Sequence, residues 1–368
     1  MILLLIDWLQ SFTHVPAVFG YVSTRMILAV LTPLLLVILL GPRFIQKLYE
    51  MKVGQAIRVE DCPTLAKLHQ KKKMTPTMGG LLMLAGILLA AILWMDWRSS
   101  NTWILIFSLV WMGGVGIIDD LLKLKFKHPK GLAGRKKFAL QAIFALCLCA
   151  YLYTRGSPIM SDYFVPFKKG VLFSLNGWWL ILAAFITVFV IVGCSNAVNL
   201  TDGLDGLAAG TVLPVALVLA VFAFLSNHLI LARYLNIIHL EGSGEISIFL
   251  CAIAGASLGF LWYNGYPAQV FMGDTGSIAL GGMLGVAAVL LRREGLLALV
   301  GAIFVAEALS VILQVGSYRL RNKKRIFLCT PLHHHFEYKG WPENKVVLRF
   351  WLVGLVLAAI GLATLKFQ

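Results

Sequence analysis

The chain has 368 residues, of which 59% are hydrophobic and only 13% are charged, and its mean hydropathy is +0.84. This composition excludes a soluble globular protein, because so few polar residues cannot cover the surface of a folded domain of this length. The formal charge of +15 comes without a basic module interleaved with aromatic residues, so no nucleic-acid partner is expected. Anionic lipid headgroups and a phosphorylated substrate suit this charge better.

Ten apolar runs are long enough to cross a bilayer, which takes about 20 helical residues. They cover residues 18–41, 76–95, 101–121, 136–154, 176–194, 205–225, 246–264, 276–291, 295–318 and 347–367. We therefore predict an all-α polytopic membrane protein that forms a single integral domain over residues 1–368. The boundary between the eighth and ninth runs is the least distinct, because only Arg292, Arg293 and Glu294 separate them. The first stretch, MILLLIDWLQ, is too short to span and is expected to lie at the membrane surface.

The basic residues indicate the orientation of the chain in the membrane. Of the 32 Lys and Arg residues, 23 lie in three connections, at 42–75, 122–137 and 319–349, and all three fall on one face in the ten-helix arrangement. The positive-inside rule makes this face cytoplasmic and places both termini on the periplasmic side of a bacterial inner membrane. The connections at 195–204 and 265–275 join the same face but contain no Lys or Arg, and they carry Asp202 and Asp274.

The third run ends in two adjacent aspartates, Asp119 and Asp120, within the stretch GGVGIIDDLL. A carboxylate left unpaired in hydrocarbon is costly, and Lys123 follows within reach on a helix. One interpretation is a helix end neutralised by an ion pair. The other is a reactive site in which one carboxylate binds a metal while its neighbour handles a proton, because adjacent residues do not share a helical face.

Two further polar stretches follow the fifth run and precede the eighth. In NAVNLTDGLDG, the residues Asn196, Asn199, Asp202 and Asp205 recur every three positions. On a helical path they form a row of oxygen ligands and hydrogen-bond donors, although a turn with Asp205 as a helix N-cap is the alternative. In FMGDTGS, Asp274 either caps a helix or presents an oxygen ligand to a diphosphate and its cation, beside free helix N–H groups.

Asn264 ends the preceding run, so oxygen and amide groups gather on this face without thiolates or paired imidazoles. Such ligands imply Mg2+ or Mn2+ and not zinc.

Two more stretches complete the face. KKKMTPTMGG suggests a tight helix entry at Thr77, beside lysines that by default only set topology. PLHHHFE contains His333, His334 and His335, which point in different directions on a helix and so make a poor three-ligand metal site. They can donate to a phosphate or a nucleoside, transfer a proton, or simply be surface residues.

The stretches KMTPTMGG, GIIDDLLK, NAVNLTDGLDGLA, FMGDTGS and PLHHHFE, in this order over ten runs, resemble the phospho-N-acetylmuramoyl-pentapeptide transferase family. That family belongs to the polyprenyl-phosphate N-acetylhexosamine-1-phosphate transferase superfamily. The resemblance implies transfer of phospho-MurNAc-pentapeptide from UDP-MurNAc-pentapeptide to undecaprenyl phosphate, which gives lipid I and UMP in peptidoglycan synthesis. It implies Mg2+ as the cofactor and a site in a cleft on the cytoplasmic face. A homodimer and contacts with other cell-wall synthesis enzymes are further expectations.

The same resemblance implies roles for individual residues. Asp274 is expected to bind the metal, with Asp119, Asp120 and Asp202 as further candidate ligands, and Asp119 is favoured as the base that deprotonates the lipid phosphate. His333 joins these aspartates as a catalytic residue. A covalent aspartyl-phosphate intermediate is the alternative to direct transfer. The expected substrate-binding residues are Lys72, Thr77, Lys123, Lys137, Asn196, Asn199, Asp202, Asn264, His334 and His335.

Two rival functions remain open at the level of sequence. A secondary transporter for an anionic solute would also carry intramembrane carboxylates such as Glu307, but the expected internal repeat is missing and the polar residues gather at one face. A sister enzyme that uses UDP-GlcNAc would share the aspartates. The long connection at about 319–346, with RLRNKKR, TPLHHHFE and several aromatic residues, favours the bulkier peptidyl donor.

Overall fold

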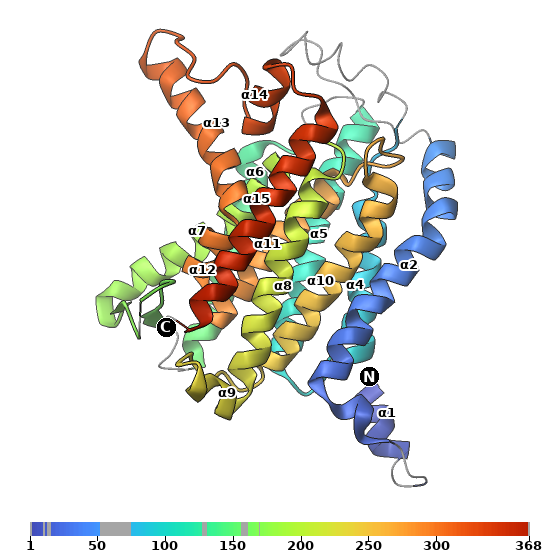
Figure 1. Cartoon of the computed structure of the whole chain (residues 1–368), viewed down its shortest axis with the longest axis vertical. Helices are drawn as coiled ribbons and strands as arrows, with labels where there is room; N and C mark the ends of the chain where they lie inside the picture. Colours follow the sequence, from blue (N-terminus) through green and yellow to red (C-terminus); the bar gives the residue numbers. More distant parts are fainter. Residues whose placement is uncertain are drawn as a thin grey trace.

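The computed structural model describes residues 2–9, 12, 16–51, 75–126, 131–155, 161–168 and 170–366, and they form a helical bundle (Figure 1). The α-helices are α1 (Ile2–Leu9), α2 (Val22–Glu50), α4 (Gly80–Trp94), α5 (Ser100–Phe126), α6 (Gly134–Thr154), α7 (Leu180–Thr201), α8 (Leu207–Asn227), α9 (Leu229–Tyr234), α10 (Ser243–Asn264), α11 (Gly273–Leu291), α12 (Glu294–Val300), α13 (Ala302–Leu320), α14 (Leu332–Tyr338) and α15 (Glu343–Ala363). Short 3-10 turns cover Ala17–Gly20, Gly177–Trp179 and Thr364–Lys366. The prediction of an all-α polytopic membrane protein is confirmed.

Among the described residues, nine helices are long and apolar enough to cross a membrane, and α4 is a shorter apolar helix of 15 residues. The second run was expected to be helical from residue 76, but Pro76 forms a β-bridge, Met78 has a left-handed φ of 71°, and α4 begins only at Gly80. The reason is a backbone pairing, since the Pro76 carbonyl accepts a hydrogen bond from Phe271 N at 2.8 Å.

The ninth run, expected as one helix over residues 295–318, consists of α12 and α13, which are separated at Gly301. Figure 1 shows α13 leaning away from α15 toward the end of the molecule where α14 lies. The boundary between α11 and α12 is sharp, because Arg292 adopts a left-handed conformation with φ 55° and ends α11. The break at Gly301 therefore lets one span follow two directions.

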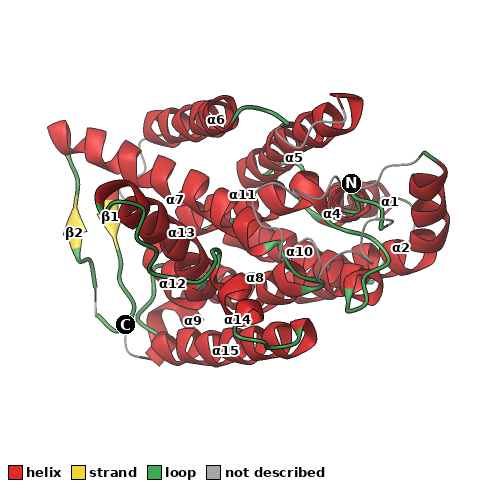
Figure 2. Cartoon of the chain, turned by 90° about the horizontal axis from the view of Figure 1, so that it is seen from above, coloured by secondary structure: helices red, strands yellow, loops and turns green. Residues whose placement is uncertain are grey.

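Helix α11 forms the centre of the bundle, surrounded by α4, α5, α7, α8 and α10 (Figure 2). Its sequence, GDTGSIALGGMLGVAAVLL, is rich in glycine and alanine, and almost every residue is buried. Small side chains let neighbouring backbones approach closely, which is how helices associate where lipid removes most of the hydrophobic driving force. The outer helices α2, α6, α13 and α15 expose most of their apolar side chains, as expected of surfaces that contact lipid.

The helix α1 and the end of α15 lie at the same end of the molecule (Figure 1). At this end β1 (Asp162–Tyr163) pairs antiparallel with β2 (Phe173–Ser174). The buried Arg292 donates from Nε and Nη2 to the Asp162 carbonyl and lies over the Tyr163 ring. A buried ion pair, Arg25 with Glu245 at 2.8 Å, joins α2 to α10. The polar motifs named above meet at the opposite end.

Candidate active site

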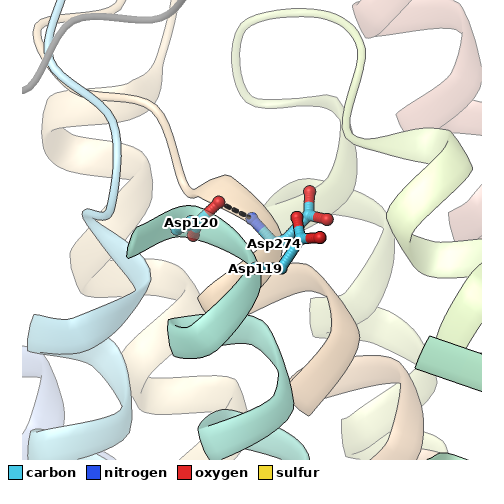
Figure 3. A group of neighbouring side chains, drawn as sticks. All are labelled: Asp119, Asp120 and Asp274. Carbon is cyan, nitrogen blue, oxygen red and sulfur yellow. Dashed lines mark hydrogen bonds between the residues drawn. The ribbon is translucent and has the colours of Figure 1, made fainter. Parts of the chain in front are cut away.

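The carboxylates of Asp119 and Asp120 on α5 and of Asp274 on α11 meet where these two helices approach each other (Figure 3). Each offers one oxygen atom, and the three atoms lie within 4.8 Å of one another. Asp119 and Asp120 are buried and Asp274 is half-buried. Two motifs that are far apart in the sequence therefore form one acidic cluster.

Close contact between α5 and α11 positions this cluster. Gly116 lies one turn before the aspartates, and a Cβ atom added to it would lie only 2.4 Å from the Asp274 carbonyl oxygen. Any side chain at this position would push the two helices apart. The carboxylates can therefore meet only because residue 116 is glycine.

The stretch TPTMGG holds the start of α11 from its other side. Gly79 N donates to the Phe271 carbonyl at 2.8 Å, and Gly80 N donates to the Met272 carbonyl at 2.9 Å. The side chain of Thr77 is buried, and its Oγ1 would lie 2.9 Å from a Cβ atom added to Gly273. The structure thus places Thr77 at the edge of the acidic cluster.

Asp120 accepts hydrogen bonds from the first turn of α11. Its carboxylate receives Asp274 N at 3.2 Å, Thr275 N at 2.9 Å and the Thr275 hydroxyl at 2.8 Å. These amides have no partner inside their own helix, and a negative charge at a helix N-terminus is favourable. Asp274 was considered as a possible cap of its own helix, but the carboxylate that caps α11 is that of Asp120 on α5.

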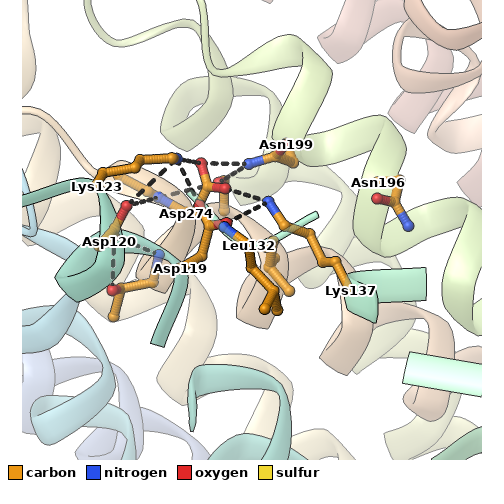
Figure 4. A network of polar contacts seen from close by, with 12 residues as sticks. Asp119, Asp120, Lys123, Leu132, Lys137, Asn196, Asn199 and Asp274 are labelled. Atoms are coloured by element: carbon orange, nitrogen blue, oxygen red, sulfur yellow. Dashed lines mark hydrogen bonds and ion pairs between the residues drawn. The ribbon is translucent and has the colours of Figure 1, made fainter. Parts of the chain in front are cut away.

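Asp119 and Asp274 share two lysines instead (Figure 4). Lys123 Nζ lies 2.6 Å from Asp119 Oδ2 and 3.0 Å from Asp274 Oδ1, and it is 3.7 Å from Asp120 Oδ1. Lys137, from the start of α6, lies 3.3 Å from Asp119 Oδ1 and 2.5 Å from Asp274 Oδ2. Three carboxylates therefore face two ammonium groups, and the cluster retains one negative charge for a further cation.

The two asparagines of NAVNLTDGLDG have separate environments. Asn199 donates from Nδ2 to Asp274 Oδ1 at 3.1 Å and to Ser277 Oγ at 2.8 Å. Asn196 lies apart from the acidic cluster in Figure 4 and donates to Gln141 Oε1 at 2.7 Å and to the Val192 carbonyl at 2.8 Å. The row of polar residues therefore reaches the cluster at Asn199 and not at Asn196.

Asp202 follows α7 and is half-buried beside the cluster, although it is not one of the three carboxylates that converge on a common point. Removal from water and the negative charges of Asp274, Asp120 and Asp205 raise the pKa of Asp202 to about 8. A carboxyl group in this environment carries its proton at neutral pH until a cation approaches.

Asn264 and Asp205 support the loops around the site through their polar atoms. Asn264 Oδ1 accepts Gly206 N at 3.0 Å, and its Nδ2 donates to the Val270 carbonyl at 2.8 Å. Asp205 accepts Ala268 N at 3.0 Å through Oδ2. Asn264 thus joins the loop before α8 to the loop before α11, with its amide held by the backbone of both.

The three histidines of α14 point in three directions, as the sequence predicts. His333 is fully buried and lies 3.2 Å from Glu307 of α13 through Nδ1. His334 Nδ1 pairs with Glu337 Oε2 at 2.6 Å, and His335 Nδ1 accepts Leu328 N at 3.2 Å. Burial and the charge of Lys339 lower the pKa of His335. The remaining predicted site residue, Lys72, lies outside the described residues.

The sequence analysis missed Gln141 as a polar residue that supports the site. It is fully buried in α6, one turn after Lys137, and it donates to Ser195 Oγ at 3.1 Å while accepting from Asn196. A lone glutamine within an apolar run was the available signal, because an intramembrane polar side chain needs a partner.

The donor atoms of the cluster fit a hard divalent cation. All three converging groups are carboxylates, and no thiolate or imidazole joins them among the described residues. Mg2+ prefers oxygen ligands and is bound in proteins through one or two carboxylates together with substrate phosphates and water. The excess of three carboxylates over two ammonium groups favours such an ion.

Comparisons with known proteins identify relatives of the chain. A family model described as glycosyl transferase family 4 matches residues 102–292, which run from the first turn of α5 to the end of α11. A relative named phospho-N-acetylmuramoyl-pentapeptide-transferase, from Protochlamydia amoebophila (strain UWE25), is 54% identical over an alignment of 410 positions that covers all of both chains.

Proposed function

The chain belongs to the phospho-N-acetylmuramoyl-pentapeptide-transferase family, and we propose that it catalyses the reaction for which that family is named. As a single integral transferase domain, it transfers phospho-MurNAc-pentapeptide from UDP-MurNAc-pentapeptide to undecaprenyl phosphate and releases UMP. The observation that carries the proposal is the acidic cluster of Asp119, Asp120 and Asp274 with its two lysines. This cluster belongs to a chain that matches its relative over the full length.

The reaction joins two anions, so the site must neutralise charge and align the reactants more than it must supply covalent chemistry. An oxygen of undecaprenyl phosphate forms a bond to the phosphorus attached to the sugar, and the bond from that phosphorus to UMP breaks. Lys123 and Lys137 each bridge Asp119 and Asp274. Their positive charges therefore lie at the acidic cluster, where they offset the charge of the bound phosphates. A divalent cation, when bound by these carboxylates, supplies further charge neutralisation for the diphosphate.

Asp119 is the residue that we assign as the base for the lipid phosphate. The backbone amides of Asp274 and Thr275 donate to the carboxylate of Asp120. The carboxylate of Asp119 accepts no hydrogen bond from the α11 backbone among the described residues. Asn199 fixes the rotamer of Asp274 through a hydrogen bond of 3.1 Å. Both Asp119 and Asp274 are shared between lysines, which supports direct displacement over attack by one of these carboxylates on the donor.

Binding of Mg2+ has a consequence that does not depend on turnover. A cation that binds the folded protein and not the unfolded chain stabilises the fold by about 2.7 kcal/mol at 100 times its dissociation constant. We expect MgCl2 to raise the melting temperature of the purified protein, and EDTA to reverse the effect. An unchanged melting temperature at millimolar MgCl2 would argue against a cation at these carboxylates.

The donor is the point at which this proposal differs from its nearest alternative, a transferase that uses UDP-GlcNAc. Helix α14 lies at the same end of the molecule as the connection that follows α13 (Figure 1), and its partly exposed surface includes the half-buried His334 and Phe336, with the half-buried Trp341 just after the helix. A peptidyl donor needs such a surface and a bare GlcNAc donor does not. The purified protein, given undecaprenyl phosphate and Mg2+, should release UMP from UDP-MurNAc-pentapeptide and turn over UDP-GlcNAc at least 100-fold more slowly at equal concentration. Preferential use of UDP-GlcNAc would contradict the assigned donor.

The proposed setting of the enzyme is the inner membrane of a bacterium, with the acidic cluster open to the cytoplasm. Basic residues of the connections at this end of the bundle support that orientation. A second copy of the chain and other enzymes of cell-wall synthesis are proposed as partners by membership of the family alone.

A further inference from the structure

Glu307 is an unusual residue for a membrane-spanning helix, because its carboxylate lies in α13 and is fully buried. Burying an ionised carboxylate is costly unless hydrogen bonds compensate it. Among the described residues, its oxygens contact only the start of α14. They accept Leu332 N at 2.6 Å and His333 N at 3.2 Å, and Oε1 lies 3.2 Å from His333 Nδ1.

The two hydrogen bonds from backbone amides explain how α14 is attached to α13. The two amides belong to the first turn of α14 and have no partner within that helix. The preceding residue is Pro331, whose side chain makes no capping hydrogen bond. The Glu307 carboxylate therefore takes the place of a cap, and its charge lies where a helix N-terminus favours an anion.

The remaining contact of Glu307 is with the ring of His333. Its imidazole is fully buried, and neither ring nitrogen has a hydrogen-bond partner among the described residues, so the 3.2 Å approach of Nδ1 to Glu307 is an electrostatic contact and not an aligned hydrogen bond. Nε2 faces the loop after α7, since a Cβ atom added to Gly203 would lie 2.2 Å from it. That loop carries Asp202 beside the acidic cluster, so the ring lies between Glu307 on one side and this loop on the other.

We propose that Glu307 is a positioning residue for His333, which fixes the imidazole in the tautomer that carries its proton on Nδ1. A neutral imidazole has one donor and one acceptor nitrogen, and an ionised carboxylate can only accept. Nε2 is then the acceptor, directed at the Asp202–Gly203 edge of the site, where it accepts a hydrogen bond from the bound donor. This inference rests on the proposed function, in which His333 belongs to the active site.

The Glu307→Gln variant tests the tautomer, because the amide keeps the shape of the side chain and can still accept from α14. Its NH2 group would donate to Nδ1, which selects the tautomer with the proton on Nε2. Replacing the carboxylate that orients a catalytic histidine lowers kcat by about 10⁴-fold in a serine protease. We expect a loss of roughly 10²-fold in kcat for Glu307→Gln, with the KM for undecaprenyl phosphate unchanged.

Nitrogen-15 NMR of histidine-labelled protein reads the tautomer directly, with the His333 signals assigned by comparison with His333→Asn. The wild type should show the proton on Nδ1 and Glu307→Gln should show it on Nε2. Glu307→Asp, which keeps the charge, should retain the wild-type tautomer and part of the activity. Ser310→Ala is the matched control, because Ser310 lies one turn further along α13 and bonds only to the Glu307 backbone carbonyl.

The outcomes separate this inference from the proposed function. A wild-type protein with the proton on Nε2 overturns the inference even if every variant fails to fold, and so does a folded Glu307→Gln protein with wild-type kcat or an unchanged tautomer. Absence of UMP release by the wild type contradicts the proposed function instead, whatever the NMR spectra show. A tautomer switch in Glu307→Gln and none in Ser310→Ala supports the positioning role.

Discussion

Asp119 and Asp120 are neighbours of the same type on α5, yet their carboxylates have different partners. Asp120 caps α11 through two backbone amides and a hydroxyl, whereas Asp119 is held by two lysines and by Leu132 N at 2.8 Å. Adjacent side chains on a helix point about 100° apart. One aspartate can therefore join two helices while the other remains available for chemistry.

Substitution of each aspartate by asparagine should separate these roles. Asp120→Asn replaces one accepting oxygen by a donor beside Thr275, so it should lower the free energy of unfolding by about 1–3 kcal/mol as well as abolish activity. Asp119→Asn removes one of three crowded carboxylates and should leave thermal stability equal to that of the wild type or higher. Its UMP release should nevertheless fall by at least 10²-fold.

The checks are thermal unfolding in detergent and UMP release on the same preparations. Asn199→Ala provides a comparison, because it removes a hydrogen bond to Asp274 and leaves all three carboxylates in place. If Asp119→Asn unfolds at a lower temperature than Asp120→Asn, the capping role assigned to Asp120 is wrong.

At the scale of helices, the approach of α5 to α11 at Gly116 sets the distance between the carboxylates. Gly116→Ala should force the backbones apart, which costs about 1–3 kcal/mol of stability and separates Asp119 from Asp274. Gly114→Ala is a matched control on the same helix, since a Cβ atom there meets nothing within 4 Å. We expect UMP release to fall at least 10-fold in Gly116→Ala and to stay unchanged in Gly114→Ala. Equal activity in the two variants would show that the helix contact does not control the site.

Helix α6 brings Lys137 to the cluster, and Gln141 fixes its position. Most of α6 is exposed, and the hydrogen bonds of Gln141 to Ser195 and Asn196 join it to α7. Gln141→Leu should cost about 0.6–1.7 kcal/mol of stability, which is typical of hydrogen bonds between membrane helices. The KM for the phosphorylated donor should rise several-fold, because Lys137 is no longer held against Asp274. Leu146→Ala, at an exposed position of α6, should leave KM unchanged; a rise of the same size in this variant would rule out the specific role.

For the whole molecule, the spans and the face that carries the site could be predicted, because both depend on quantities that sequence states directly. An apolar run of about 20 residues must cross the bilayer, and polar residues at the ends of such runs must meet at its surface. The different partners of the Asp119 and Asp120 carboxylates could not be predicted, since they depend on how α5 is rotated against α11. Likewise, neither the break at Gly301 nor the contact of Glu307 with α14 follows from a local pattern, because each arises from the packing of distant helices.

The orientation of the bundle yields the last prediction. If α4 crosses the membrane with the nine long helices of the described residues, the crossings number ten, which predicts that the two ends of the chain lie on one side of the membrane. The basic run RLRNKKR follows α13 at the opposite end, and basic connections stay in the cytoplasm. A reporter that is active only in the periplasm, fused after Gln368, should therefore be active, and the same reporter inserted after Lys323 should be inactive. The reverse pattern would place the acidic cluster on the periplasmic side, where a cytoplasmic nucleotide donor could not reach it.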